Sequence, residues 1–184
     1  MDKTKDGLRA YARSVRERLG EEEIRQRSDV MARLIASGDG YEKAGEILCY
    51  MPLKGEIDLT LLMEKALRDG KRLFLPKVLD SQGKMAFGSV SSLKGLVRGP
   101  FGLLEPEKTR EFPFLPSSLA VVPSLLLGRD LYRIGYGKGY YDRFLRNFPG
   151  RKLGVSLGEC LLESVPHEET DVRLDEGITE EGWI

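Results

Sequence analysis

The stretch Leu119-Ala120-Val121-Val122-Pro123 is apolar at every position, which is typical of a strand that is buried on both of its faces. Three other short runs have a similar character: EILCYM at 46–51, which Pro52 stops, RLFLP at 72–76 and KLGVSL at 152–157. Because such strands need cover on both sides, the four runs predict one mostly parallel sheet.

Helical patterns alternate with these strands. Apolar residues at helical spacing predict helices over 4–19, over a segment that ends at Gly38 and over one that ends at Asp69-Gly70, and 139–148 also has a helical pattern. Further strands are expected at 84–90 and 177–180. The alternation predicts an α/β fold: a three-layer, open, mostly parallel sheet with helices on both faces, in a single domain of residues 1–184.

Composition narrows the classes of function. The 184 residues carry 29 Lys+Arg against 29 Asp+Glu, so the formal net charge is zero. A general binder of nucleic acids or of membrane surfaces would show an excess of basic residues. No apolar run is long enough to span a bilayer, and the N-terminus lacks the apolar region of a secretory signal. We therefore expect a cytoplasmic protein with no nucleic-acid or membrane partner.

The cysteines and the histidine limit which catalytic groups and metal ligands the chain can offer. Cys49 and Cys160 stand beside apolar neighbours and are expected to be buried, reduced thiols. His167 is the single histidine, which excludes mechanisms and zinc sites that need two. Any metal must therefore bind mainly to oxygen.

The segment RIGYGKGYYDR at 133–143 carries the strongest chemical signal. Its three glycines at alternate positions leave backbone N–H groups open to an anion, and the helix expected after them adds its positive end. Arg133 and Lys138 add full positive charges, and four of the seven tyrosines lie at 132–141, where their rings could stack on a heterocycle. The pattern predicts a polyphosphate-binding loop. The alternative is a glycine-rich surface loop whose tyrosines pack on the sheet.

Carboxylates mark two other places. Glu56 lies on the turn after the strand at 46–51, where it could accept hydrogen bonds from the N–H groups of a small polar ring. Alternatively, Asp58 caps the next helix and Glu56 interacts with its dipole. Asp171 and Asp175 lie in an acidic tail whose oxygens suit Mg²⁺, and the alternative there is a solvated acidic stretch.

The segment RIGYGKGYYDR resembles the signature of the 5-formyltetrahydrofolate cyclo-ligase family, also called 5,10-methenyltetrahydrofolate synthetases, whose pattern is close to R-L-G-x-G-[GK]-G-Y-Y-D. The likeness extends over nearly the whole chain, although the pieces outside this segment are short. They are Lys5 with Arg9, Glu56-Ile57-Asp58, Pro76, Gly102 with Glu105-Pro106, and a tail with Pro166, Glu168, Asp171, Asp175 and Thr179-Glu180.

The resemblance implies a compact three-layer α/β domain akin to the sugar-phosphate isomerase and CoA-transferase group. It also implies a reaction, the ATP- and Mg²⁺-dependent closure of 5-formyltetrahydrofolate to 5,10-methenyltetrahydrofolate with release of ADP and phosphate. In the family's chemistry the formyl oxygen attacks the γ-phosphate, and N10 of the folate then attacks the carbon of the resulting imino-phosphate. The expected partners are a reduced folate and ATP, and the expected assembly is a monomer or a weak homodimer.

The resemblance further implies a site, residue by residue. ATP would be bound by Lys5, Arg9, Arg133, Ile134, Gly135, Tyr136, Gly137, Lys138, Gly139, Tyr140 and Tyr141. The folate would be bound by Met51, Glu56, Tyr136, Gly137, Lys138, Gly139 and Tyr140. The catalytic residues would be Lys138, Arg133 and Tyr140, and the metal ligands would be Asp142 and Asp171. Lys138 would offset the charge that develops on the transferred phosphoryl group.

The chain departs from the family pattern between Pro123 and Arg133, where Ser124, Gly128 and Leu131 replace a glycine, an aspartate and a second glycine. Because leucine adopts positive φ less readily than glycine, we expect the turn into the loop to take another shape. Two other functions stay open. One is a non-catalytic protein that senses folate and nucleotide, and the other is a sugar-phosphate isomerase, which would need a general base with a tuned pKa.

Overall fold

The structure, a computed structural model, describes residues 2–109 and 113–184. Its helices are α1 (Lys5–Ala36), α2 (Asp39–Lys43), α3 (Thr60–Arg68) and α4 (Tyr140–Leu145), with 3₁₀ turns η1 (Pro100–Gly102) and η2 (Gly158–Cys160). Its strands are β1 (Glu46–Leu48), β2 (Arg72–Val78), β3 (Met85–Val90), β4 (Val97–Arg98), β5 (Leu104–Glu105), β6 (Leu119–Pro123), β7 (Leu126–Gly128), β8 (Arg133–Ile134), β9 (Arg151–Val155), β10 (Leu161–Leu162), β11 (Glu176–Thr179) and β12 (Gly182–Trp183). Among the described residues, no helix has the length and apolar character needed to cross a bilayer.

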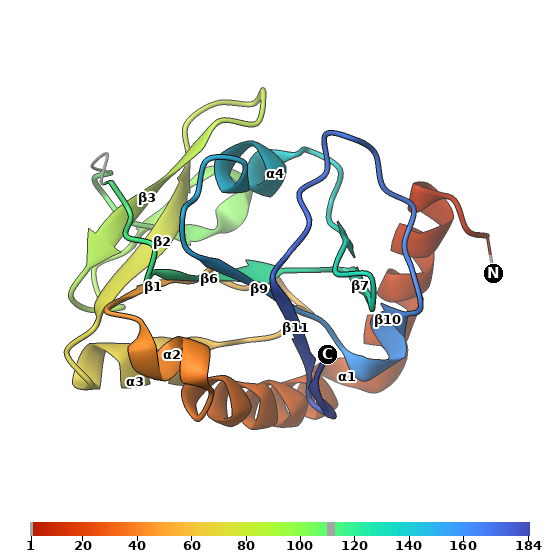
Figure 1. Cartoon of the computed structure of the whole chain (residues 1–184), viewed down its shortest axis with the longest axis horizontal. Coiled ribbons are helices and arrows are strands. Elements are labelled where there is room, and N and C mark those ends of the chain that lie inside the picture. Colours follow the sequence, from red (N-terminus) through yellow and green to blue (C-terminus); the bar gives the residue numbers. More distant parts are fainter. Residues whose placement is uncertain (1, 110–112) are drawn as a thin grey trace.

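The central sheet is mostly parallel. In the described chain it has seven strands in the order β12-β11-β9-β6-β1-β2-β3 (Figure 1). The strands from β2 through β1, β6 and β9 to β11 pair in parallel, and the edge strands β3 and β12 are antiparallel to their neighbours. The predicted mostly parallel α/β sheet is confirmed.

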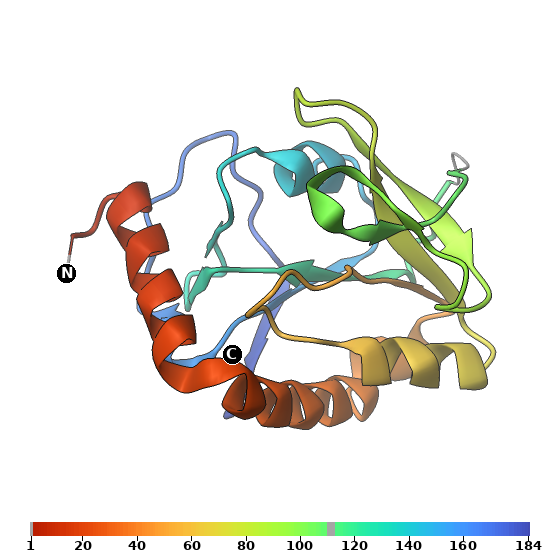
Figure 2. The same cartoon turned by 180° about the vertical axis from the view of Figure 1, so that it is seen from behind.

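Alternate residues of each strand face opposite layers. On β2, Leu73 and Leu75 join the core cluster that includes α1 and α3, whereas Phe74 between them joins the cluster that includes α4. On β6, Val121 joins the cluster that includes α1 and α3, and Val122 joins the cluster that includes α4. Helices α1, α2 and α3 cover one face and α4 lies over the other (Figures 1 and 2). This arrangement explains why consecutive residues in the middle of these strands are apolar.

Helix α1 consists of two segments joined at Gly20, whose φ of 77° and ψ of 168° are not helical. The break agrees with the two predicted helices, the second of which ends at Ala36, close to Gly38. The second segment lies along the central sheet, and the first turns away beside the small sheet β10-β7-β8 (Figure 2). The bend therefore brings the basic N-terminal segment next to the residues that follow β8.

Several short elements were not predicted. The strand expected at 46–51 ends at Leu48, and β12 follows the strand expected at 177–180. An antiparallel pair, β7 and β8, stands between β6 and the glycine-rich segment, with Leu126 opposite Ile134. Runs of two or three residues are too short to show a periodic pattern.

Leu131, in the turn between β7 and β8, has a φ of 66°. Leucine therefore does not avoid positive φ here, which was the reason to expect another turn shape. Backbone hydrogen bonds hold it there: its N–H donates to the carbonyl oxygen of Gly128, and its own carbonyl oxygen accepts from the N–H of Leu174, both at 2.9 Å. Its side chain also packs against the core cluster on the α4 side.

The strand order reverses at β1 and β6. Strand β1 leads to β2 on one side, while β6 leads to β9 and β11 on the other. In open α/β sheets, ligands bind in the crevice at the carboxyl ends of the strands where the order reverses. The segments that begin there carry Met51 and Glu56 after β1 and Ser124 after β6.

Candidate active site

Residues 135–139 form an open loop between β8 and α4. Within the described chain, none of their five backbone N–H groups donates a hydrogen bond to the protein. Gly137 and Gly139 have φ values of +90° and +68°, which other residues adopt only at a cost. Because α4 has six residues, the free N–H groups rather than a helix dipole make this loop attractive to an anion.

Several cations accompany the loop, and one of them, Arg143, donates from Nη1 to the carbonyl oxygen of Lys138 at 2.8 Å. Arg9 donates from Nε to the carbonyl oxygen of Gly135 at 2.9 Å, and a Cβ atom at Gly137 would lie 3.0 Å from Nη2 of the same guanidinium. Lys138 is exposed, and no described residue forms a hydrogen bond or ion pair with its ammonium group. The loop thus combines free backbone donors with a free positive charge.

Arg133 lies inside the protein. Its side chain is 5% exposed, and Nη1 lies 3.1 Å from Oδ1 of Asp142. The same Oδ1 accepts a hydrogen bond from the N–H of Val172 at 3.0 Å. Because a buried guanidinium without a charged partner is costly, the ion pair between Arg133 and Asp142 stabilises the fold around it. A direct contact between Arg133 and phosphate stays a prediction.

Lys5 bonds to the acidic tail. Its ammonium group lies 2.7 Å from Oδ2 of Asp171 and 3.0 Å from Oε1 of Glu168. Partial burial opposes the charge on Lys5, but these hydrogen bonds outweigh it and raise its pKa above 10.5. For Asp171, burial alone would raise the pKa, but the hydrogen bonds from Lys5 and from the N–H of Glu168, together with the charges of Lys5 and Arg133, outweigh it and lower the pKa below its usual value. Both groups are therefore charged at neutral pH.

Asp142 and Asp171 approach each other, because Asp142 accepts its hydrogen bond from the residue that follows Asp171. Their side chains are 22% and 21% exposed. Mg²⁺ typically takes one or two protein carboxylates and completes its shell with water and phosphate, so this pair fits the ion. The described residues contain no cluster of three or more His, Cys, Asp or Glu that could hold a metal by itself. The assignment stays a prediction.

Glu56 is buried in the turn after β1. Its Oε1 accepts a hydrogen bond from the hydroxyl of Tyr136 at 2.7 Å, and Oε2 accepts one from the N–H of Leu53 at 2.8 Å. The alternative that placed Glu56 in a helical first turn is wrong, because α3 begins at Thr60. Asp58 is not the N-cap of α3 either, because that position is Leu59, although its Oδ1 accepts a hydrogen bond from the N–H of Thr60 at 2.8 Å.

Tyr136 connects the loop at 135–139 to Glu56 in the turn after β1. Burial, together with the charge of Glu56, raises its pKa to about 12, so its hydroxyl stays protonated at neutral pH and donates to Glu56. Met51 lies partly buried against the core cluster on the α1 side.

Arg16 belongs to the same site and was missed from the sequence. Its Nη1 donates to the hydroxyl oxygen of Tyr136 at 3.0 Å, and Nη2 donates to the carbonyl oxygen of Ser124 at 3.3 Å. A signal was present: steps of four and seven residues place Lys5, Arg9 and Arg16 on one face of the helix.

The other predicted aromatic and loop residues lie apart from Glu56. The hydroxyl of Tyr140 donates to the carbonyl oxygen of Asp80, in the β2–β3 hairpin, at 2.9 Å. Tyr141 packs against both core clusters, and burial raises its pKa. Ile134 is buried in β8, so its side chain is part of the core. The structure therefore brings Tyr136, but not Tyr140, to the carboxylate expected to bind folate.

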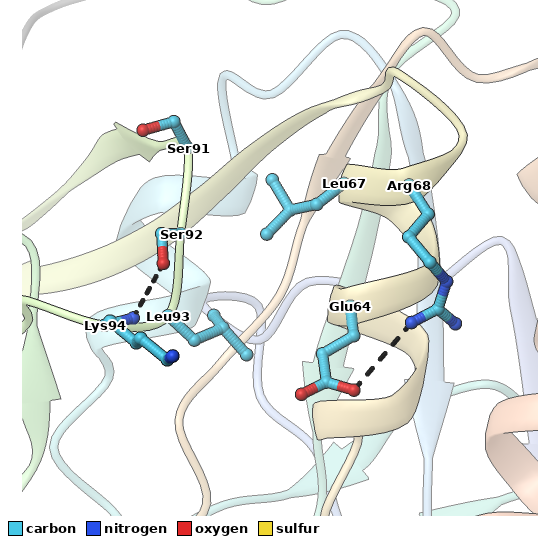
Figure 3. A pocket seen from close by; sticks show the side chains of 7 residues that line it. All are labelled: Glu64, Leu67, Arg68, Ser91, Ser92, Leu93 and Lys94. Carbon is cyan, nitrogen blue, oxygen red and sulfur yellow. Dashed lines mark hydrogen bonds and ion pairs between the residues drawn. The ribbon is translucent and has the colours of Figure 1, made fainter.

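Two hollows lie elsewhere on the surface. One, of about 370 Å³, lies between α3 and the segment after β3 and is lined by Glu64, Leu67, Arg68, Ser91, Ser92, Leu93 and Lys94 (Figure 3). The other, of about 580 Å³, is lined by Lys3, Leu8, Asp130, Leu162, Glu163, Ser164, Val165, Pro166 and His167. Neither lining includes a residue expected to bind ATP, folate or Mg²⁺.

Comparisons with known proteins agree with the resemblance. The sequence model of the 5-formyltetrahydrofolate cyclo-ligase family matches residues 1–180. A 5-formyltetrahydrofolate cyclo-ligase of Escherichia coli (strain K12) is 31% identical over 142 residues, which cover 74% of this chain and 78% of that protein. A probable 5-formyltetrahydrofolate cyclo-ligase of Caenorhabditis elegans is 27% identical, covering 96% and 92%. The NMR structure of the Aquifex aeolicus 5,10-methenyltetrahydrofolate synthetase superposes with a TM-score of 0.84 at 33% identity, covering 97% and 91%.

Proposed function

Because the chain belongs to the 5-formyltetrahydrofolate cyclo-ligase family and is therefore an enzyme of the ligase class, we propose that it closes 5-formyltetrahydrofolate to 5,10-methenyltetrahydrofolate, using ATP and Mg²⁺ and releasing ADP and phosphate. The observation that carries the proposal is the loop at 135–139, where five backbone N–H groups have no described protein partner. Lys138 and Arg9 supply the positive charge that a polyphosphate needs beside such donors.

The reaction proceeds in two steps. The formyl oxygen attacks the γ-phosphorus, the bond from phosphorus to the β-phosphate oxygen breaks, and ADP leaves. N10 then attacks the formyl carbon and loses its proton, while the carbon–oxygen bond breaks and phosphate leaves. The substrates supply both nucleophiles, so the protein needs none. In agreement, burial raises the pKa of Cys49 to about 12 and that of Cys160 to about 11, so neither is a thiolate at neutral pH.

The contribution of the protein is alignment and charge stabilisation. Holding two reactants in the reactive geometry can be worth about 7 to 11 kcal/mol of the barrier. The N–H groups of Gly135, Gly137 and Gly139 hold the triphosphate, and Lys138 offsets the charge on the phosphoryl group in transfer. Glu56, Met51 and Tyr136 seat the folate on the other side of the same loop.

Asp142 and Asp171 would hold Mg²⁺, directly or through water. When bound, the ion neutralises part of the charge on the triphosphate. Arg133 keeps Asp142 oriented, and Lys5 does the same for Asp171.

The test is to mix purified protein with 5-formyltetrahydrofolate and MgATP and to follow the near-ultraviolet absorbance of the methenyl product. We expect product to form with equal amounts of ADP and phosphate, and no product when ATP is omitted or replaced by an analogue that cannot transfer its γ-phosphate. If the protein binds both ligands and forms no product, the proposal fails and a sensing function replaces it.

A further inference from the structure

Among the described residues, two buried polar atoms without a hydrogen-bond partner belong to Arg16 and Ser124, which bond to each other through other atoms. In the described chain the buried side-chain atoms without a hydrogen-bond partner are Nε of Arg16 and the hydroxyls of Ser124 and Ser156. Ser124 is 6% exposed and directly follows β6, the strand that pairs with β1. Its carbonyl oxygen accepts the hydrogen bond from Arg16, so Arg16 lies beside the carboxyl end of β6, the strand next to β1. Because unpaired buried groups are costly, they often mark a place where a ligand completes the hydrogen bonds.

The hydroxyl of Tyr136 indicates what kind of ligand group fits there. It donates to Glu56 at 2.7 Å and accepts from Arg16 at 3.0 Å. No ion pair within 4.0 Å joins Arg16 to Glu56 in the described chain, so the hydroxyl stands between an anion and a cation. A group that takes its place must offer a donor to Glu56 beside an acceptor for Arg16. An N–H next to a carbonyl, as on one edge of a lactam ring, meets this requirement.

The reduced pteridine of a folate has such an edge, with N–H at position 3 beside the carbonyl at position 4. Resting on the proposed function, we propose that Arg16 and Ser124 are specificity-determining residues that donate hydrogen bonds to this carbonyl oxygen. Glu56 then accepts from the neighbouring N–H, and the half-exposed Tyr136 moves aside. The hydroxyl of Ser124 supplies a donor that a glycine at this position would lack.

The experiment compares 5-formyltetrahydrofolate with its 4-amino analogue, which presents a donor where the carbonyl presents an acceptor. Binding of each is measured by titration calorimetry without ATP. The natural protein is expected to prefer the 4-oxo compound by at least about tenfold. Ser124→Ala is expected to lower its affinity for that compound by about fivefold, and Arg16→Met by about tenfold or more. Both variants should discriminate less between the two ligands, with the affinity for ATP unchanged.

Ser156→Ala is the matched control. Its hydroxyl is also buried and unpaired, at 0% exposure, and it lies on β9's side of Ser124, directly after Val155, which accepts a hydrogen bond from the N–H of Ser124. In the described chain Ser156 has no hydrogen bond with Arg16. We expect this variant to bind both ligands within about twofold of the natural protein. Loss of an unpaired hydroxyl should not lower the thermal midpoint of either serine variant, which separates binding from folding.

Three outcomes overturn the proposal. If Ser124→Ala and Arg16→Met keep the natural preference while turnover is normal, the assignment of these residues is wrong and the proposed function stands. If Ser156→Ala weakens binding as much as Ser124→Ala, the loss of affinity is caused by altered packing of the strands and not by a lost hydrogen bond to the ligand. If the natural protein binds neither ligand, the proposed function fails and this assignment fails with it.

Discussion

The hydroxyl of Tyr136 lies 2.7 Å from Oε1 of Glu56, a residue 80 positions earlier in the chain. This hydrogen bond connects the loop proposed to hold the triphosphate with the carboxylate proposed to hold the folate. A reaction between two bound substrates requires that their sites be held together, because misalignment of about 1 Å can cost a hundredfold in rate. The contact thus marks the place where the two proposed sites meet.

Replacing Tyr136 by phenylalanine tests this link. Tyr136→Phe keeps the ring and removes the hydroxyl that occupies Glu56 and Arg16. We expect the free energy of unfolding to fall by about 1 kcal/mol, measured by urea denaturation, because one hydrogen bond to a charged group is lost. The affinity for 5-formyltetrahydrofolate should stay equal or rise a few-fold. A tenfold loss of affinity would instead mean that the hydroxyl itself contacts the substrate.

Lys138 is the free cation of the loop, so its removal should affect the chemistry and not the fold. For Lys138→Ala we expect an unchanged thermal midpoint and a turnover lower by at least about tenfold, measured by methenyl-folate formation. Lys94→Ala, at another exposed lysine, is the control and should keep full turnover. Equal turnover in the two variants would remove the role assigned to Lys138.

Asp142 has a structural task that complicates its use as a test of metal binding. Asp142→Asn leaves the guanidinium of Arg133, at 5% exposure, without a charged partner. We expect the free energy of unfolding to fall by about 2 kcal/mol. Asp171→Asn, whose partner Lys5 is 25% exposed, should lose less than about 1 kcal/mol. Equal losses in urea denaturation would show that the Arg133 pair is no more important than a surface ion pair.

Asp171 is therefore the better residue for a magnesium titration. If it is a ligand of Mg²⁺, Asp171→Asn should need several-fold more Mg²⁺ for half of its maximal rate, because one anionic oxygen ligand is lost. The rate at saturating Mg²⁺ should recover most of the natural value. A titration curve that superposes on that of the natural protein would exclude Asp171 as a ligand.

The layers of the fold could be predicted because they depend on local patterns. Alternate burial of residues such as Val121 and Val122 requires apolar side chains at both positions, and this requirement is visible in the sequence. The turn at Leu131 could not be predicted in this way. Its positive φ is held by hydrogen bonds to Gly128 and Leu174, and the second of these lies more than forty residues away.

The sequence predicted several residues of the candidate site, but it did not predict which other residues they contact. The backbone N–H groups at 135–139 that have no described protein partner agree with the glycine spacing, and Gly137 and Gly139 have the positive φ that a missing side chain permits. The burial of Arg133 and the contact of Tyr140 with Asp80 depend on how distant segments pack, which no local pattern reports. Arg16 was missed because its function depends on Tyr136, far along the chain.

The most direct test of the central claim is an NMR titration of the isotopically labelled protein with MgATP. We expect the backbone amide signals of Gly135, Gly137 and Gly139 to shift in a saturable manner, because their N–H groups exchange water for phosphate oxygens. If those three signals stay in place while amides elsewhere in the chain respond to the nucleotide, the loop does not hold the triphosphate and the proposed site is wrong.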